Sequence, residues 1–417
     1  MRTSGIILLL TLTACAQAPR TDTFRPADTG ELTRLHERYR VPAITTREFT
    51  HAELWSALGP VVDAAGGPER DEAGRSAEGR AIYRMRYGSG PTRVLLWSQM
   101  HGNESTATMA LADLFRFLAE APDDPRARRL AERLTIHAVP MLNPDGAERF
   151  QRRNAMAIDI NRDARALSTP EARILRGIQR QFRPEFGFNL HDQDVRARVG
   201  GSDRLAAIAL LAPPYNQARD DNAVRMRAKR VAAVVRAAAE PMVAGHVTRY
   251  DDTFNPRAFG DLMQSWGTST VLIESGGWRN DPEKQHLRRV NFVALLTALD
   301  AIATGAYASA SPASYETLPE NGRPVNDVLV RGPVIVVPGL EPYRADVMIQ
   351  FADPLAKRGA RVFEVGDLAD AAARDTVEAA GLFLHAAQPL AVDRPAAFVL
   401  RRARDAASEA VWRMDGS

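Results

Sequence analysis

Apolar and polar residues follow two different periods along this chain, and they predict strands and helices in alternation. Residues 81–87 alternate between apolar and polar and predict a strand, and residues 93–98 predict a buried strand after the turn Ser89-Gly90-Pro91. Further apolar runs of strand length occupy residues 134–142, 186–190, 205–211 and 269–273. Helical patterns fall at residues 105–120, 169–182, 217–240 and 281–304. This alternation predicts an α/β fold with helices on the faces of one sheet.

The remaining segments suggest how the chain is divided. Residues 16–48 are polar and carry prolines, so we expect a tether, with a short helix near residues 31–40, ahead of a folded domain at 49–305. Small residues at 306–312 indicate a linker. Residues 313–417 mix strand and helix signals, strongly β-like at 327–337, and predict a small C-terminal α/β or β-rich domain without an assignable chemistry.

The first fifteen residues are typical of a bacterial export signal. Arg2 precedes an apolar run at 6–12 that is too short to span a bilayer, and Leu12-Thr13-Ala14-Cys15 resembles a lipobox. Because the position and flanks of Cys15, the only cysteine, fit a lipobox, we expect it to carry a lipid anchor to the membrane. Ala16 after it favours the periplasmic face of the outer membrane. The alternatives are a plain signal peptide cut nearby, or a small buried cysteine.

The distribution of charge along the chain argues against a nucleic-acid partner. The 417 residues include 54 basic and 51 acidic side chains, for a formal charge of +3, and the two signs are interspersed. Nearly all the basic residues are arginine, which we interpret as a compositional habit. No long basic run is present, so we expect no nucleic-acid partner.

Candidate chemistry lies in four short motifs, three of which follow predicted strands. They are His101-Gly102-Asn103-Glu104, Asp159-Ile160-Asn161-Arg162, Asn189-Leu190-His191 and Leu272-Ile273-Glu274. Ligands of open α/β sheets bind at the carboxyl ends of strands. The spacing of His101 and Glu104 points both side chains the same way, and both types bind zinc. His191 is the best candidate for a third ligand, because no strand delivers its weaker rival His246.

The other motifs offer an anion site and a base. Arg152, Asn161 and Arg162 are candidates for binding a carboxylate, since an arginine fork pairs with it through two hydrogen bonds. Asp159 is expected to brace this loop. Glu274 ends an apolar strand, where a carboxylate beside a metal can accept a proton from water. The plain alternatives are surface arginines and a solvent-facing acid.

Together the motifs resemble the zinc metallocarboxypeptidase family over residues 50–305. The resemblance implies a mixed, mostly parallel sheet with helices on both faces and one Zn²⁺ held by His101, Glu104 and His191. It implies that Asn161, Arg162 and Arg152, nine residues before Asn161, bind the C-terminal carboxylate of a peptide substrate. Arg152 would also stabilise the oxyanion, and Glu274 would be the general base of this metallopeptidase.

One departure concerns the mobile tyrosine that closes over the substrate in many members of the family, about twenty residues before the base. Here the nearest candidate, Tyr250, stands 24 residues before Glu274, and residues 252–261 contain no tyrosine. Asp261, in the same stretch, is a candidate for favouring a basic terminal residue.

Three alternatives stay open from sequence. The substrate is either a general peptide or a murein stem peptide, which a periplasmic address favours. A second enzyme class is the amidohydrolase of the aspartoacylase and succinylglutamate desuccinylase type, which also uses His-Gly-Asn-Glu; secretion and the C-terminal segment argue against it. The third is an inactive, lipid-anchored binding protein, against which the complete set of ligands and base argues.

Overall fold

The computed structural model describes residues 23–416, so the predictions for Cys15 and the export signal lie outside the described residues. Its centre is an eight-stranded mixed sheet with the order β1-β2-β4-β3-β5-β9-β7-β8. The strands are β1 (Glu69–Arg75), β2 (Ala81–Tyr87), β3 (Thr92–Ser98), β4 (Leu134–Val139), β5 (Phe186–Asp192), β7 (Ile208–Leu211), β8 (Val247–Arg249) and β9 (Ser269–Ser275). The four central strands are parallel. The predicted mixed sheet, mostly parallel, is confirmed.

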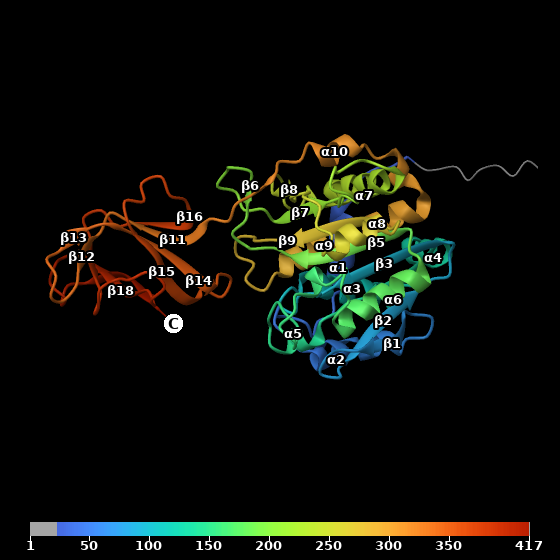
Figure 1. Cartoon of the computed structure of the whole chain (residues 1–417), viewed down its shortest axis with the longest axis horizontal. Helices are drawn as coiled ribbons and strands as arrows, with labels where there is room; N and C mark the ends of the chain where they lie inside the picture. The colour runs from blue at the N-terminus through green and yellow to red at the C-terminus, as the bar shows by residue number, and fades with distance from the viewer. Residues whose placement is uncertain (1–22, 417) are drawn as a thin grey trace, which may run out of the picture.

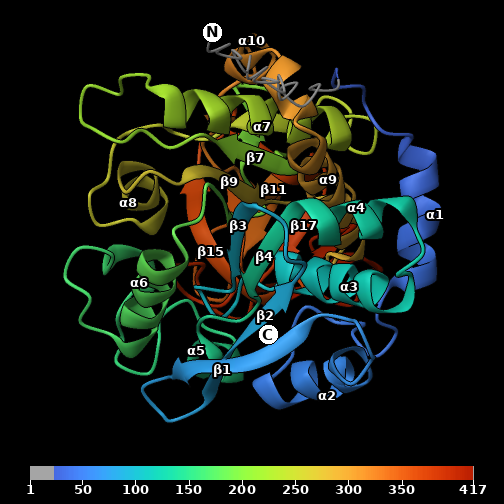
Figure 2. The same cartoon turned by 90° about the vertical axis from the view of Figure 1, so that its right-hand side faces the viewer.

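Helices cover both faces of this sheet because its central strands are apolar on both sides. Along β3, Val94 and Leu96 pack into the larger core, whereas Leu95 and Trp97 pack into the smaller one. The helices of the larger core are α1 (Thr29–Tyr39), α2 (His51–Val62), α3 (Thr106–Glu120), α4 (Pro125–Arg133), α7 (Ala223–Ala239) and α9 (Gln285–Thr304). Those of the smaller core are α6 (Pro170–Phe182) and α8 (Phe259–Ser265), on the left in Figure 2.

The expected tether at residues 16–48 is wrong for the described part, residues 23–48, although the short helix expected there forms as α1. Leu32 of α1, Val41 and Ile44 are buried in the larger core. The fully buried guanidinium of Arg288 in α9 donates to the backbone carbonyls of Val41 and Ile44 and to both carboxylate oxygens of Asp113 in α3. This segment is therefore an integral part of the larger domain.

The expected linker at 306–312 is wrong for a similar reason. Residues 306–309 form a 3₁₀ turn (η2, Ala306–Ser309), and α10 (Pro312–Glu316) packs on α7. Tyr315 is buried, and its hydroxyl accepts a hydrogen bond of 3.0 Å from the backbone N–H of Ala212. Small side chains allow this close packing, which composition alone does not distinguish from a flexible connection.

The C-terminal domain is β-rich, which decides between the two predicted alternatives. It contains two sheets, with the orders β15-β14-β11-β16 and β13-β12-β17-β18-β19, whose apolar faces share one core. The strands are β11 (Asn326–Arg331), β12 (Val334–Val336), β13 (Tyr343–Arg344), β14 (Asp346–Asp353), β15 (Arg358–Gly366), β16 (Ala373–Glu378), β17 (Phe383–His385), β18 (Ala397–Arg401) and β19 (Ala410–Asp415). It lies beside the larger domain (Figure 1).

A short ribbon connects the two domains. Strand β10 (Asn321–Gly322) pairs antiparallel with β6 (Arg198–Val199) of the larger domain. Between residues 23 and 416, no helix combines the length and apolar character that a membrane crossing requires.

Candidate active site

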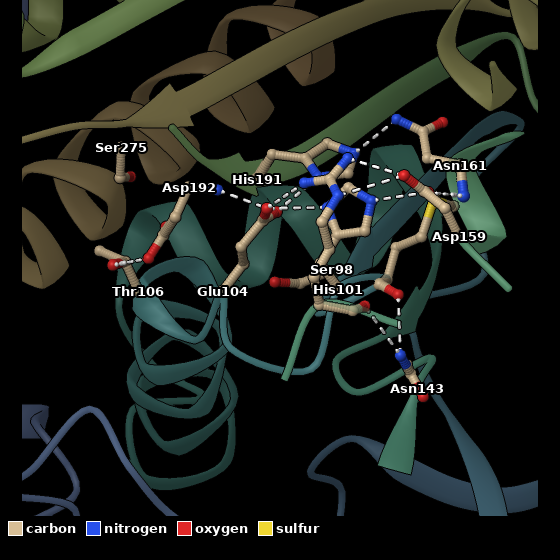
Figure 3. A network of polar contacts seen from close by, with 12 residues as sticks. Ser98, His101, Glu104, Thr106, Asn143, Asp159, Asn161, His191, Asp192 and Ser275 are labelled. Atoms are coloured by element: carbon tan, nitrogen blue, oxygen red, sulfur yellow. Dashed lines mark hydrogen bonds and ion pairs between the residues drawn. The ribbon is translucent and has the colours of Figure 1, made fainter. Parts of the chain in front are cut away.

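The candidate site lies at the carboxyl ends of three neighbouring parallel strands, β3, β5 and β9. His101 follows β3, His191 is the sixth residue of β5, and Glu274 is the sixth residue of β9. His191 and Glu274 are direct neighbours in the strand register. The sheet therefore brings together three motifs that lie far apart in the sequence (Figure 3 shows the two histidines).

His101, Glu104 and His191 form a compact, buried cluster of metal-donor atoms. One donor atom from each residue lies within 4.8 Å of the others. Glu104 Oε1 is 2.8 Å from His101 Nδ1, and Glu104 Oε2 is 2.7 Å from His191 Nδ1 (Figure 3). Two imidazole nitrogens and a carboxylate that converge in this way fit the donor set of a catalytic zinc, which takes three protein ligands.

The loop that carries His101 and Glu104 requires glycine at its second position. A Cβ atom on Gly102 would lie 2.0 Å from the backbone carbon of Gly146, which is closer than any side chain can approach. The backbone N–H of Glu104 donates to the carbonyl of His101 at 3.1 Å and closes a tight turn. Gly102 thus lets this turn pack against α5 (Pro144–Glu148).

Asp159 orients one of the candidate ligands. Its Oδ1 lies 3.0 Å from His101 Nε2, and its Oδ2 accepts hydrogen bonds of 3.1 and 2.9 Å from Nε and Nη2 of Arg152. Although burial opposes the shift, the hydrogen bond and charge of His101, with help from Arg152, hold the pKa of Asp159 well below its usual range. A carboxylate on Nε2 leaves Nδ1 of His101 to face the metal position. Asp159, which the sequence predicted to brace this loop, is therefore also a partner of His101.

Arg152, Asn161 and Arg162, the predicted carboxylate readers, line the same cavity as His101, Glu104 and Glu274. This cavity has a volume of about 490 Å³. Arg152 Nη1 donates to Glu104 Oε1 at 3.1 Å. Asn161 Oδ1 accepts a hydrogen bond of 2.9 Å from the backbone N–H of Phe259, which fixes the amide. Arg162 is exposed, and among the described residues its side chain donates only to the carbonyl of Asn161.

Glu274 is a buried carboxylate in an environment that disfavours its charge. Burial raises the pKa of Glu274 well above its usual range, and the negative charges of Glu104 and Asp192 raise it further. The positive charge of Lys284 partly opposes this rise in the pKa of Glu274. The Lys284 ammonium donates to Asp192 Oδ2 at 3.1 Å and to the carbonyl of Ser275 at 3.0 Å. Sequence reasoning missed Lys284 and Asp192. The one available signal was that Asp192 directly follows His191.

Tyr250 and Asp261 also line this cavity. The charge of Glu274, followed by burial, raises the pKa of Tyr250 to about 12. Burial raises the pKa of Asp261, in the first turn of α8, to about 6, although its Oδ1 accepts a hydrogen bond of 2.9 Å from the backbone N–H of Asn255. The weaker rival His246 lies elsewhere, packed edge-on against Trp278.

Comparison with known proteins agrees with this geometry. Residues 69–198 match the zinc carboxypeptidase family (Peptidase M14), a range that includes both histidines, Glu104 and the predicted carboxylate readers but not Glu274. Residues 69–198 are therefore similar to the zinc carboxypeptidase domain, and the family with that domain is zinc-dependent.

Individual relatives match over limited lengths. The chain is 32% identical over 100 residues to a protein named probable carboxypeptidase 2 from Trichophyton verrucosum, and 29% identical over 151 residues to the human carboxypeptidase N catalytic chain. These alignments cover 24% and 31% of this chain, and 19% and 33% of the two relatives. The crystal structure of thrombin activatable fibrinolysis inhibitor superposes with a TM-score of 0.50 at 15% identity, over 67% of this chain and 80% of that one. This last similarity concerns the fold alone.

Proposed function

We propose that this protein is a zinc-dependent metallocarboxypeptidase that hydrolyses the C-terminal amide bond of peptides with a free terminal carboxylate. One observation carries the proposal: a single cavity is lined by two members of the metal-donor cluster, His101 and Glu104, by the buried carboxylate of Glu274, and by the anion-binding side chains Arg152, Asn161 and Arg162. A hydrolase of internal bonds would have no use for the last of these.

In this proposal one zinc ion per chain is held by His101, Glu104 and His191, through the imidazole nitrogens and carboxylate oxygen that lie close together in the structure. When bound, zinc supplies Lewis-acid activation of a water molecule and of the scissile carbonyl. Asp159 keeps the His101 ring in the orientation that ligation needs.

Glu274 is the general base of the proposed reaction. Its raised pKa brings its proton affinity closer to that of the groups it serves, so it can accept a proton from water and pass it to the leaving amine. Arg152, Asn161 and Arg162 bind the terminal carboxylate and set which bond is cut. Arg152 also lies beside Glu104, where it can stabilise negative charge on the reacting carbonyl oxygen. Tyr250, next to Glu274, is proposed as a further substrate contact.

Two variants test the assignment directly. Glu274→Gln should keep zinc but lose about two to four orders of magnitude in kcat, whereas His191→Ala should lose both zinc and activity. Glu132→Gln, an exposed carboxylate outside the site, is the matched control. Zinc content by metal analysis and turnover of blocked dipeptides are the measurements. Full activity in the Glu274→Gln protein would remove the proposed mechanism.

The substrate panel distinguishes the remaining alternatives. General peptides and murein stem peptides both present an amide bond before a free carboxylate, so digestion of each, followed by mass spectrometry, separates the two sources. Turnover of N-acyl amino acids alone would instead indicate an amidohydrolase of the aspartoacylase type. Stoichiometric zinc without turnover of any substrate would indicate a binding protein.

We also propose, from the sequence alone, that Cys15 carries a lipid that anchors the protein to the periplasmic face of the outer membrane. Expression of the full chain in a Gram-negative host, followed by fractionation, tests this. The wild type should be found with outer membranes, and Cys15→Ser should move to another fraction. An unchanged distribution would contradict the anchor.

A further inference from the structure

A second cavity adjoins the candidate active site, and one of its walls belongs to the C-terminal domain. Its volume is about 750 Å³, and it shares Glu104, Arg152 and residues 192–194 with the first cavity. The opposite side is formed by residues 352–355, Arg358 and Gly359, around the turn between β14 and β15. In Figure 1 these two strands belong to the sheet of the C-terminal domain that lies nearer the larger domain.

Ion pairs fix this turn against the larger domain. The largely buried guanidinium of Arg47 lies 2.5 Å from Asp353, and Arg358 Nη2 donates to Asp353 and to Glu48 at 2.9 and 3.0 Å. The carbonyl of Arg47 in turn accepts a hydrogen bond of 2.5 Å from the hydroxyl of Ser105, the residue after Glu104. The turn is therefore linked to the loop that carries a candidate metal ligand.

The loop that follows His191 is held by the C-terminal side of the chain as well. Gln193 Oε1 accepts a hydrogen bond of 2.6 Å from Asn321 in β10, and Arg196 pairs with the buried Asp327 at 3.3 Å. Gln193 and Arg196 both line the second cavity. The C-terminal domain and its connecting ribbon thus brace two sides of the same space.

The arrangement of the two cavities suggests what the second one binds. The proposed carboxylate readers Asn161 and Arg162 line the first cavity only, whereas Glu104 and Arg152 lie between the two. A peptide whose last residue fills the first cavity must continue past Glu104, and the second cavity is the space that adjoins it there. Its volume falls within the range of about 300–1,000 Å³ that encloses drug-sized ligands, which is enough for a few residues.

We propose that the second cavity binds the peptide residues preceding the scissile bond, and that the β14–β15 turn restricts access to slim, unfolded chains. This inference rests on the proposed carboxypeptidase function. Basic and acidic side chains line the cavity in nearly equal number, and most are paired with one another. Such a lining suits a polar peptide of either sign better than a polyanion. The substrate class is therefore short peptides and flexible tails.

The test uses one narrowing and one widening variant of the full chain. Leu355→Trp adds bulk to the turn, with Ala407→Trp, on the exposed β18–β19 connection, as the matched control. The second variant replaces residues 354–357 with Asn-Gly, a two-residue hairpin turn. Three substrates share the same last two residues: an N-acyl dipeptide, an octapeptide, and a folded protein whose C-terminal tail is only those residues. Thermal unfolding verifies that each variant folds.

Leu355→Trp should lower kcat/KM for the octapeptide by about tenfold and leave the dipeptide nearly unchanged. The shortened turn should accelerate cleavage of the folded protein, and Ala407→Trp should change nothing. Equal effects on all three substrates, or no effect of either variant, would overturn the role of the turn while leaving the carboxypeptidase function standing. If the wild type cleaves none of the three, the proposed function itself fails, and this inference with it.

Discussion

Asp261→Asn should make the protein more stable at neutral pH and less selective toward its substrates. Asp261 is 7% exposed, and no basic side chain among the described residues lies within hydrogen-bonding distance of its carboxylate. Burial raises its pKa to about 6 from an ordinary 3.8. The folded protein therefore carries a carboxylate whose ionisation opposes folding.

The expected magnitude follows from these two pKa values. Between pH 4 and pH 6 the unfolded chain loses the Asp261 proton while the folded protein retains it, so the free energy of unfolding falls as the pH rises. Above pH 6 both states are ionised and the effect is constant. A pKa of about 6 instead of 3.8 corresponds to about 3 kcal/mol. Asparagine does not titrate, and its side-chain oxygen can still accept the hydrogen bond from Asn255.

Urea unfolding of wild type and variant at pH 4 and pH 7 measures this effect. The stability of Asp261→Asn relative to wild type should increase by up to about 3 kcal/mol between the two pH values. Asp123→Asn is the control, since the side chain of Asp123 is 99% exposed and should give no such change. An Asp261→Asn advantage that is the same at both pH values would refute the assigned pKa.

The effect of Asp261 on substrate preference is measured with peptides that end in Arg or Phe. If Asp261 faces the terminal side chain, the wild type should prefer Arg at pH 7, lose that preference as the pH falls through 6, and lose it at every pH in Asp261→Asn. A wild-type preference for Phe, or an unchanged ratio in the variant, would remove Asp261 from the specificity site. The stability cost would then have no functional counterpart.

Other substitutions and metal removal give further predictions. Asp159→Asn should weaken zinc binding about 10–100-fold, as measured by competition with a chelator, because His101 loses its orienting carboxylate. Arg288→Met should cost about 3–5 kcal/mol in urea unfolding, because it leaves the carboxylate of Asp113 buried without its main partner. Zinc at about 100 times its Kd should stabilise the wild type by about 2.7 kcal/mol, read as a higher melting temperature that a chelator reverses.

The sequence predicted the elements around the site well because local signals mark them. Residues 81–87 alternate in polarity and form β2 over the same bounds. Helix α6 begins where Thr169 and Pro170 predict: the Thr169 hydroxyl accepts from the backbone N–H of Ala172, and Pro170 occupies the first turn. Motifs at strand ends could then be brought together by the rule that parallel strands end at one edge.

The parts that sequence reasoning missed depend on contacts between distant segments. Residues 28–48 look like a polar tether, yet they enclose the buried guanidinium of Arg288, more than 240 residues away in the chain. Lys284 and Asp192 lie 92 residues apart and form an ion pair at the site, with no motif to mark either. Local composition carries no information about such pairings, because burial depends on the complete fold.

The structure gives Tyr250 a clearer position than its spacing in the sequence did. The sequence offered it only as a weak match to a mobile lid tyrosine. In the structure it follows β8, its backbone N–H donates to the carbonyl of Leu210 at 2.8 Å, and its pKa is already raised by the charge of Glu274. The sheet thus positions Tyr250 in the wall of the same cavity as the proposed base. In the proposed arrangement of the substrate, the β14–β15 turn of the C-terminal domain encloses the residues before the scissile bond, since it lines the second cavity.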